Sequence, residues 1–143
     1  MAVLTGSATI RFGVADKGDD LEQSTFGSAR EEGGIEIQAT AGDVFVIPAG
    51  IAHKTYAAEP AAPFAFLTPG DGHSINVQDP RGSLAEIEFS GFTMIGAYPA
   101  GGEWNFAKGG EDIGHFDDVW SVDKPVRDPI LGEAEEGLRG LWQ

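Results

Sequence analysis

The stretch Gly42-Asp43-Val44-Phe45-Val46-Ile47-Pro48-Ala49-Gly50-Ile51-Ala52-His53 decides how this chain is expected to fold. The continuous apolar run at residues 44–47 predicts a strand that is buried on both faces. A Pro-x-Gly turn at residues 48–50 would end this strand. The next strand would begin at His53, so the sequence places one imidazole at a fixed position on an otherwise apolar sheet.

Alternating apolar residues predict further strands on both sides of this stretch. Residues 7–12 and residues 35–40 both have a period of two, and their inward-facing side chains are expected to be Ala8, Ile10, Phe12, Ile35, Ile37 and Ala39. In residues 53–57, His53 and Thr55 would share a face with Ala57. Lys54 and Tyr56 would lie on the opposite face as a solvated charge and a cover residue. Shorter strands are expected at residues 64–67, 84–89 and 92–98.

Long irregular segments join these strands. Residues 14–34 and 59–83 are rich in turn-forming residues and are expected to be long loops. From residue 99 onward the chain is expected to wrap the outside of the sheets, with one short helix at residues 133–141. Aromatic side chains would hold this tail in place: Trp104, Phe106, Phe116 and Trp120. No repeat or linker divides residues 1–143, so we expect a single domain.

This pattern predicts an all-β fold, a small sandwich or barrel of the jelly-roll type. The periodicity alone leaves an immunoglobulin-like sandwich open. The net charge of −14 argues against binding to nucleic acids or anionic membranes, which would repel the chain. The absence of cysteine excludes disulfides, thiolate metal sites and cysteine nucleophiles. No apolar stretch predicts a signal peptide or a membrane span, so we expect a cytoplasmic protein.

The spacing of Gly42, Pro48, Gly50 and His53 resembles the second conserved motif of the cupin superfamily. That motif typically ends in asparagine, where this chain has Ala57. Three further segments are similar to a group of small single-domain cupins from bacteria and fungi: residues 3–13, residues 94–101 with Trp104, and residues 125–142. The resemblance therefore covers most of the chain and implies the jelly-roll barrel of the cupins.

The resemblance also implies where a metal would be bound. Metal-binding cupins carry two histidines and a glutamate in their first motif, and if Gly6 closes that motif these ligands would fall before Met1. His53 is then the only residue left of the family's ligand set. His73 and His115 could join it around a divalent iron, manganese, nickel or zinc ion. Because catalytic sites generally offer three protein ligands, a protein without a metal cofactor is favoured.

His53, Thr55 and Tyr98 are the candidate catalytic residues. An imidazole can act as a general acid or base near neutral pH, and the two hydroxyl groups could position a substrate oxygen. A second set of large side chains is expected either to fill the core or to line a site for a flat or cyclic apolar ligand: Phe64, Phe66, Phe92, Met94 and Trp104.

Three functions are compatible with these features. The first is a metal-independent lyase, isomerase, epimerase or cyclase that acts on a small apolar carbonyl-containing metabolite through His53. The second is a metal-dependent cupin oxygenase with recruited ligands, and the third is a non-catalytic binding or scaffold module. The expected partner is a small-molecule substrate. A sheet edge left unpaired also predicts a homodimer, with residues 2–12 near the interface.

Overall fold

The computed structural model describes residues 1–69, 75, 77–98, 101–102, 104, 116–123, 126–128 and 131–141. Two antiparallel sheets form the framework, which confirms the expected all-β class. Strands β1 (Ala2–Thr5) and β5 (Thr93–Ile95) form the smaller sheet. Strands β2 (Ser7–Phe12), β3 (Ile35–Thr40) and β4 (His53–Glu59) form the larger sheet in the order β3-β2-β4. The strands of the described part do not close into a barrel.

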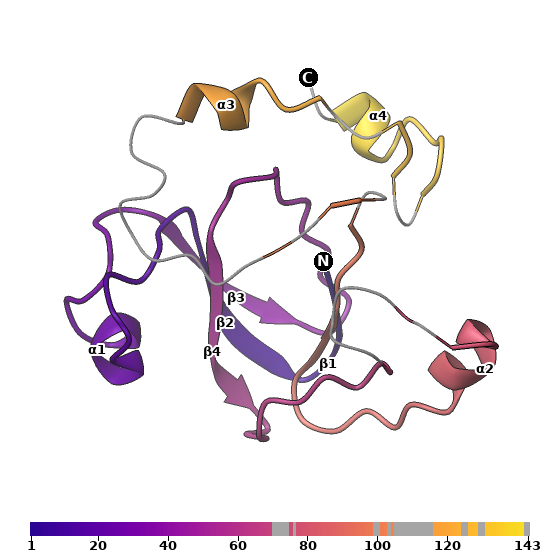
Figure 1. The fold of residues 1–143 in the computed structure, drawn as a ribbon, viewed down its shortest axis with the longest axis horizontal. Helices are drawn as coiled ribbons and strands as arrows, with labels where there is room; N and C mark the ends of the chain where they lie inside the picture. Colours follow the sequence, from indigo (N-terminus) through magenta and orange to yellow (C-terminus); the bar gives the residue numbers. More distant parts are fainter. Residues whose placement is uncertain are drawn as a thin grey trace.

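The part of the chain that the structure describes also contains four short helices around the sheets: α1 (Leu21–Thr25), α2 (Pro80–Ala85), α3 (Phe116–Trp120) and α4 (Leu138–Leu141). Figure 1 shows the three-stranded sheet at the centre, with α1 and α2 on opposite sides of it and α3 and α4 along a third side. None of the described helices is long and apolar enough to cross a membrane.

The chain passes from one sheet to the other at Gly6, which separates β1 from β2 and has a φ of +73°. At this corner the backbones of Glu59 and Phe92 come very close. A methyl group on residue 6 would lie 2.6 Å from the carbonyl oxygen of Glu59 and 2.9 Å from the Cα atom of Phe92. Both the backbone angle and the lack of space therefore require glycine here.

The core lies where the two sheets meet. Val3 of β1 packs in one cluster with Ile10 and Phe12 of β2 and Ala39 of β3, and all four side chains are buried. Partly buried side chains complete the cluster: Met1, Phe45, Ile47, Phe92 and Met94. The predicted inward face of β2 is confirmed, because Ala8 and Ile10 are fully buried.

Strand β3 pairs with β2 over six consecutive residue pairs, in which Ile35 lies opposite Phe12 and Ile37 opposite Ile10. These isoleucines are therefore on the predicted face of the sheet. Because β3 is an edge strand, however, Ile35 remains 61% exposed and Ile37 remains 36% exposed.

The prediction that residues 44–47 form a strand buried on both faces is wrong. This segment follows β1 through hydrogen bonds such as that from the Phe45 N–H to the Met1 carbonyl, and its only bridge joins Val44 to Ala2. Phe45 faces the core, whereas Val44 and Val46 are about half exposed, at 51% and 45%. The side chains of the segment alternate between two faces, and only the face with Phe45 and Ile47 is covered by the core.

The predicted strand at residues 84–89 is also wrong, because helix α2 ends at Ala85 and residues 86–89 form no strand. The carboxylate of Asp79 caps the helix by accepting a hydrogen bond from the Gly82 N–H, and Pro80 follows as the first helical residue. Both features favour a helix start. Residues 64–67 form no regular strand, and the strand expected at residues 92–98 shortens to β5.

Two connecting segments also differ from expectation. The loop at residues 14–34 contains α1, whose N-terminus is capped by the carboxylate of Asp20. The helix expected at residues 133–141 is reduced to α4. Trp120 is 86% exposed and therefore does not hold the tail, although Val119 of α3 lies beside Gly50. Phe106 and the side chain of Phe116 lie outside the described residues.

Candidate functional site

His53 lies at the start of β4, opposite Phe12 of β2. Its imidazole stacks on the ring of Phe12, with 6.3 Å between the ring centroids and 28° between the planes. Phe12 is buried and packs in turn against Phe45, at 5.3 Å between centroids. Since His53 itself is exposed, an accessible imidazole lies against the Phe12 ring at the margin of the apolar core.

Thr55 is the next residue of β4 on this face, and it lies opposite Ile10. Its hydroxyl oxygen is 3.9 Å from the sulfur of Met94, a residue of β5. This contact joins the two sheets beside the core. The expectation that His53 and Thr55 share a face is therefore confirmed, and Met94 and Phe92 pack against the core.

The remaining members of the aromatic set form a separate group. The rings of Phe64 and Phe66 meet edge to face, with centroids 5.1 Å apart, and Trp104 lies 6.2 Å from Phe66. Phe64 is 80% exposed and Phe66 is half exposed. Tyr98 is half exposed and its ring lies next to Gly96. Within the described part of the chain, no hydrogen bond or ring contact joins Tyr98 to His53.

The described residues around His53 include no group of metal ligands. No three histidine, aspartate or glutamate side chains come together in the part of the chain that the structure describes. His73 and His115 lie outside the described residues. A divalent ion held by one imidazole would keep most of its waters, so the described residues by themselves do not supply the three ligands that a catalytic metal generally has.

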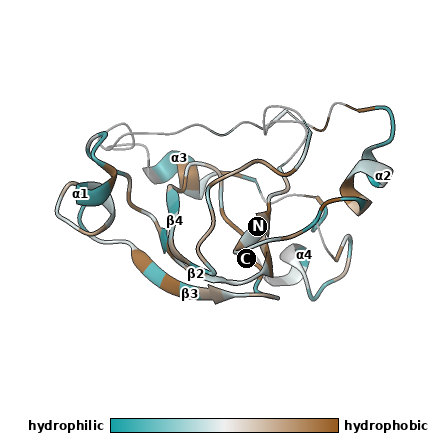
Figure 2. Ribbon diagram, turned by 90° about the horizontal axis from the view of Figure 1, so that it is seen from below, coloured by the Kyte–Doolittle hydropathy of each residue, from teal (hydrophilic) through white to brown (hydrophobic). Residues whose placement is uncertain are grey.

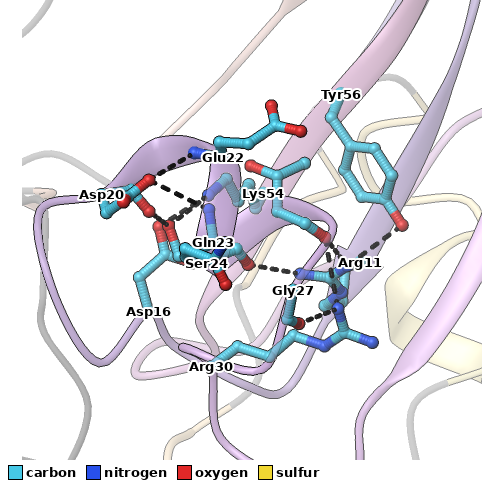
Figure 3. Close-up of polar contacts among 11 residues, drawn as sticks. Arg11, Asp16, Asp20, Glu22, Gln23, Ser24, Gly27, Arg30, Lys54 and Tyr56 are labelled. Atoms are coloured by element: carbon cyan, nitrogen blue, oxygen red, sulfur yellow. Dashed lines mark hydrogen bonds and ion pairs between the residues drawn. The ribbon is translucent and has the colours of Figure 1, made fainter.

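The opposite face of the same sheet carries a polar cluster centred on Arg11, which the sequence pattern did not indicate (Figure 3). Arg11 is only 3% exposed. Its Nε donates to the Glu36 carboxylate at 2.9 Å, and its Nη1 and Nη2 donate to the carbonyls of Ser24 at 3.2 Å and Thr25 at 2.8 Å. The guanidinium therefore ties the α1 segment to the sheet.

Tyr56 and Lys54 complete this cluster. The Arg11 Cζ lies 4.9 Å from the centre of the Tyr56 ring, and Phe26 packs edge-on against that ring. Tyr56 is thus the expected cover residue. Lys54 is not a solvated charge, because its Nζ donates to Asp16 at 2.7 Å and its side chain is mostly buried.

The cluster also shifts the pKa values of two of its members, Glu36 and Tyr56. Hydrogen bonds from Tyr56 and Arg11 hold the pKa of Glu36 below its ordinary value. Burial, and then the hydrogen bond to Glu36, raise the pKa of Tyr56. The signal that could have revealed this cluster is a charged residue inside a regular strand. Such a residue needs a partner when a loop covers that face.

Comparison with known proteins gives no match to a family model, to a curated protein or to a solved structure. The two faces of the β3-β2-β4 sheet therefore have to be compared by their own geometry. On the Arg11 face, the described cations Arg11 and Lys54 are engaged in internal contacts. The His53 face offers an accessible titratable side chain and is the better candidate for a site.

Proposed function

We propose that this protein binds a small apolar carbonyl-containing metabolite over the His53 face and moves a proton on it as a metal-independent lyase or isomerase. One observation carries the proposal, namely the exposed imidazole of His53 stacked on the buried ring of Phe12. Ligand sites usually combine apolar walls with a few placed polar groups, and this face has both.

The chemistry needs no oxidant or reductant. The apolar part of the ligand would lie at the margin of the core, where Phe45 is only partly buried, and its carbonyl would be beside His53. The imidazole would take a proton from the carbon next to the carbonyl and return it at a different carbon or from the other side. Thr55 could donate its hydroxyl to the substrate oxygen, because its present acceptor, the Met94 sulfur, is a weak one.

The same proposal includes a cupin-like jelly roll as the scaffold. Its support is the arrangement of β1 and β2, which are consecutive strands in different sheets, each paired on both sides. In this scaffold His53 would face the space between the sheets. We assign no step to Tyr98, since its ring lies beside Gly96 beyond the end of β5.

The test is hydrogen exchange into a panel of small apolar ketones and aldehydes dissolved in D₂O, followed by NMR. Wild-type protein should speed deuterium uptake at the carbon next to the carbonyl above the buffer rate. His53→Ala should lower the rate at least tenfold, as expected for loss of a general acid–base group. Thr55→Val should retain part of the rate, and His115→Ala should leave it unchanged.

Three outcomes would contradict the proposal in different ways. Binding of a panel compound without any His53-dependent exchange would identify a non-catalytic binding module. Loss of activity in both His53→Ala and His115→Ala, together with a stoichiometric metal in the purified protein, would favour the metal-dependent oxygenase. Absence of both binding and exchange would leave the His53 face without a small-molecule role.

A further inference from the structure

The outer edge of β3 offers unpaired backbone groups. The Thr40 N–H donates to the Asp43 carboxylate at 2.7 Å, and the Thr40 carbonyl accepts from the Asp43 N–H, so neither bonds to β2. Residues of an antiparallel strand alternate between pointing toward and away from a given neighbour. Glu36 and Gln38 therefore also direct their N–H and C=O groups away from β2. Within the described residues, no hydrogen bond is formed by these backbone groups of Glu36 and Gln38.

Strand β3 lacks the features that usually protect an edge. It runs for six residues with no proline, lysine or bulge. Its only charge, Glu36, is already paired with Arg11. Figure 2 shows β3 at the margin of the sheet with alternating hydrophobic and hydrophilic residues. The other edges are less suitable, because β4 is interrupted at Ala57, whose φ is +50°, and β5 has only three residues.

The sequence of β3 is complementary to itself in one antiparallel register. With Ile37 opposite Ile37 of a second copy, each Glu36 lies opposite a Gln38, and both of these residues present outward backbone groups. The two Glu36–Gln38 pairs would then each form two backbone hydrogen bonds between the copies. Ile35 would lie opposite Ala39 on the apolar face, so the exposed isoleucines would become covered. A shift by two residues in one direction would place Glu36 opposite Glu36, which is unfavourable.

From this register we propose that two copies of the chain associate through β3 about a two-fold axis at Ile37, joining their sheets into one six-stranded sheet. This interface differs from the one expected at residues 2–12, because β1 and β2 already have neighbours on both sides. It is also independent of any reaction at His53.

Disulfide trapping tests the register directly, since the chain contains no cysteine of its own. In Ile37→Cys the two sulfur atoms would come from a non-hydrogen-bonded pair, whose Cβ atoms are about 4.5 Å apart. Mild oxidation should give a covalent dimer rapidly. Ile35→Cys and Val46→Cys are the controls, because both positions are more exposed than Ile37, at 61% and 45% against 36%, but would face no cysteine in the partner. Equal crosslinking of all three variants would overturn the proposal.

Analytical ultracentrifugation of the full chain, from nanomolar to millimolar concentration, measures the association itself. Gln38→Glu should raise the dissociation constant roughly 2- to 30-fold, because it places like charges opposite each other twice. Gln38→Lys should lower it, and Val46→Lys should leave it unchanged. A monomer at every concentration would overturn the proposal. Concentration-independent protection of the Glu36 and Gln38 amides from hydrogen exchange would also overturn it, by showing that the chain covers this edge itself.

Discussion

At the scale of single residues, Arg11 is the residue whose environment differs most from what its type suggests. A cation in an alternating strand would normally face water, yet here it is buried and all of its contacts are internal. Hydrogen bonds from a charged donor are the strong ones, and carbonyls left without a donor are costly when buried. The polar face of the strand therefore contributes to stability rather than to solubility.

We expect Arg11→Ala to lower the free energy of unfolding by about 3 kcal/mol, because the Ser24 carbonyl would lose its charged donor and the Thr25 carbonyl would keep only the one from Arg30. Arg11→Lys should lose less, since an ammonium keeps the charge but cannot reach all acceptors. The matched control is Arg127→Ala, whose ion pair with Glu133 is largely exposed and should matter by less than about 0.5 kcal/mol. Urea unfolding measures all three, and equal losses at both arginines would contradict this role.

Glu36 should make stability depend on pH in the acidic range. Its pKa in the folded state is lowered, so its contribution is fully present above the ordinary value of 4.5 and is lost as the pH falls through the folded pKa. Urea titrations at neutral pH and at several values below 4.5 should therefore converge for wild-type protein and Glu36→Gln as the pH falls. A difference between them that stays constant would rule out this linkage.

At the scale of the elements, the sequence predicted those features that depend on periodicity. The alternating faces of β2 and β3 were correct because each residue of a strand has its side chain on a defined side. Residues 44–47 were misjudged because a continuous apolar run does not say whether both faces are covered. Helix α2 was missed because its origin is local, in the cap formed by Asp79 and Pro80, and not in any apolar period.

This cap can be tested without disturbing the rest of the fold. Asp79→Ala should destabilise α2 by about 1 kcal/mol, because the Gly82 N–H loses its acceptor. No residue of α2 is buried, so the midpoint of global unfolding should hardly change. Faster hydrogen exchange of the amides in α2 would be the readout. Asp79→Asn retains an acceptor and should behave like wild-type protein, and faster exchange in that variant would point to a cause other than the cap.

At the scale of the whole molecule, the two-sheet architecture was predictable, but the order of strands was not. Which strand becomes an edge depends on long-range pairings that leave no periodic signal in the sequence. The exposure of Ile35 and Ile37 could therefore not be predicted, because it follows from the edge position of β3. The candidate site was likewise predictable only in part. His53 and Thr55 could be placed together by strand geometry, whereas the stacking on Phe12 required the register of β2 with β4.

The corner at Gly6 is where the two sheets depend on each other, and a pair of substitutions isolates its effect. Gly6→Ala and Gly13→Ala both place a side chain at a positive φ, +73° and +86°, at the two ends of β2. At Gly13 the nearest atom to a new methyl group would be 3.8 Å away, so only conformational strain of about 1–2 kcal/mol is expected.

At Gly6 the methyl group would collide with the backbone of Glu59, which must shift and would separate the strands that meet there. Overpacking adds about 1–3 kcal/mol to the same strain, so Gly6→Ala should be clearly the less stable variant in urea unfolding. Equal losses at the two glycines would mean that backbone conformation alone, and not close contact between the sheets, accounts for the glycine at this corner.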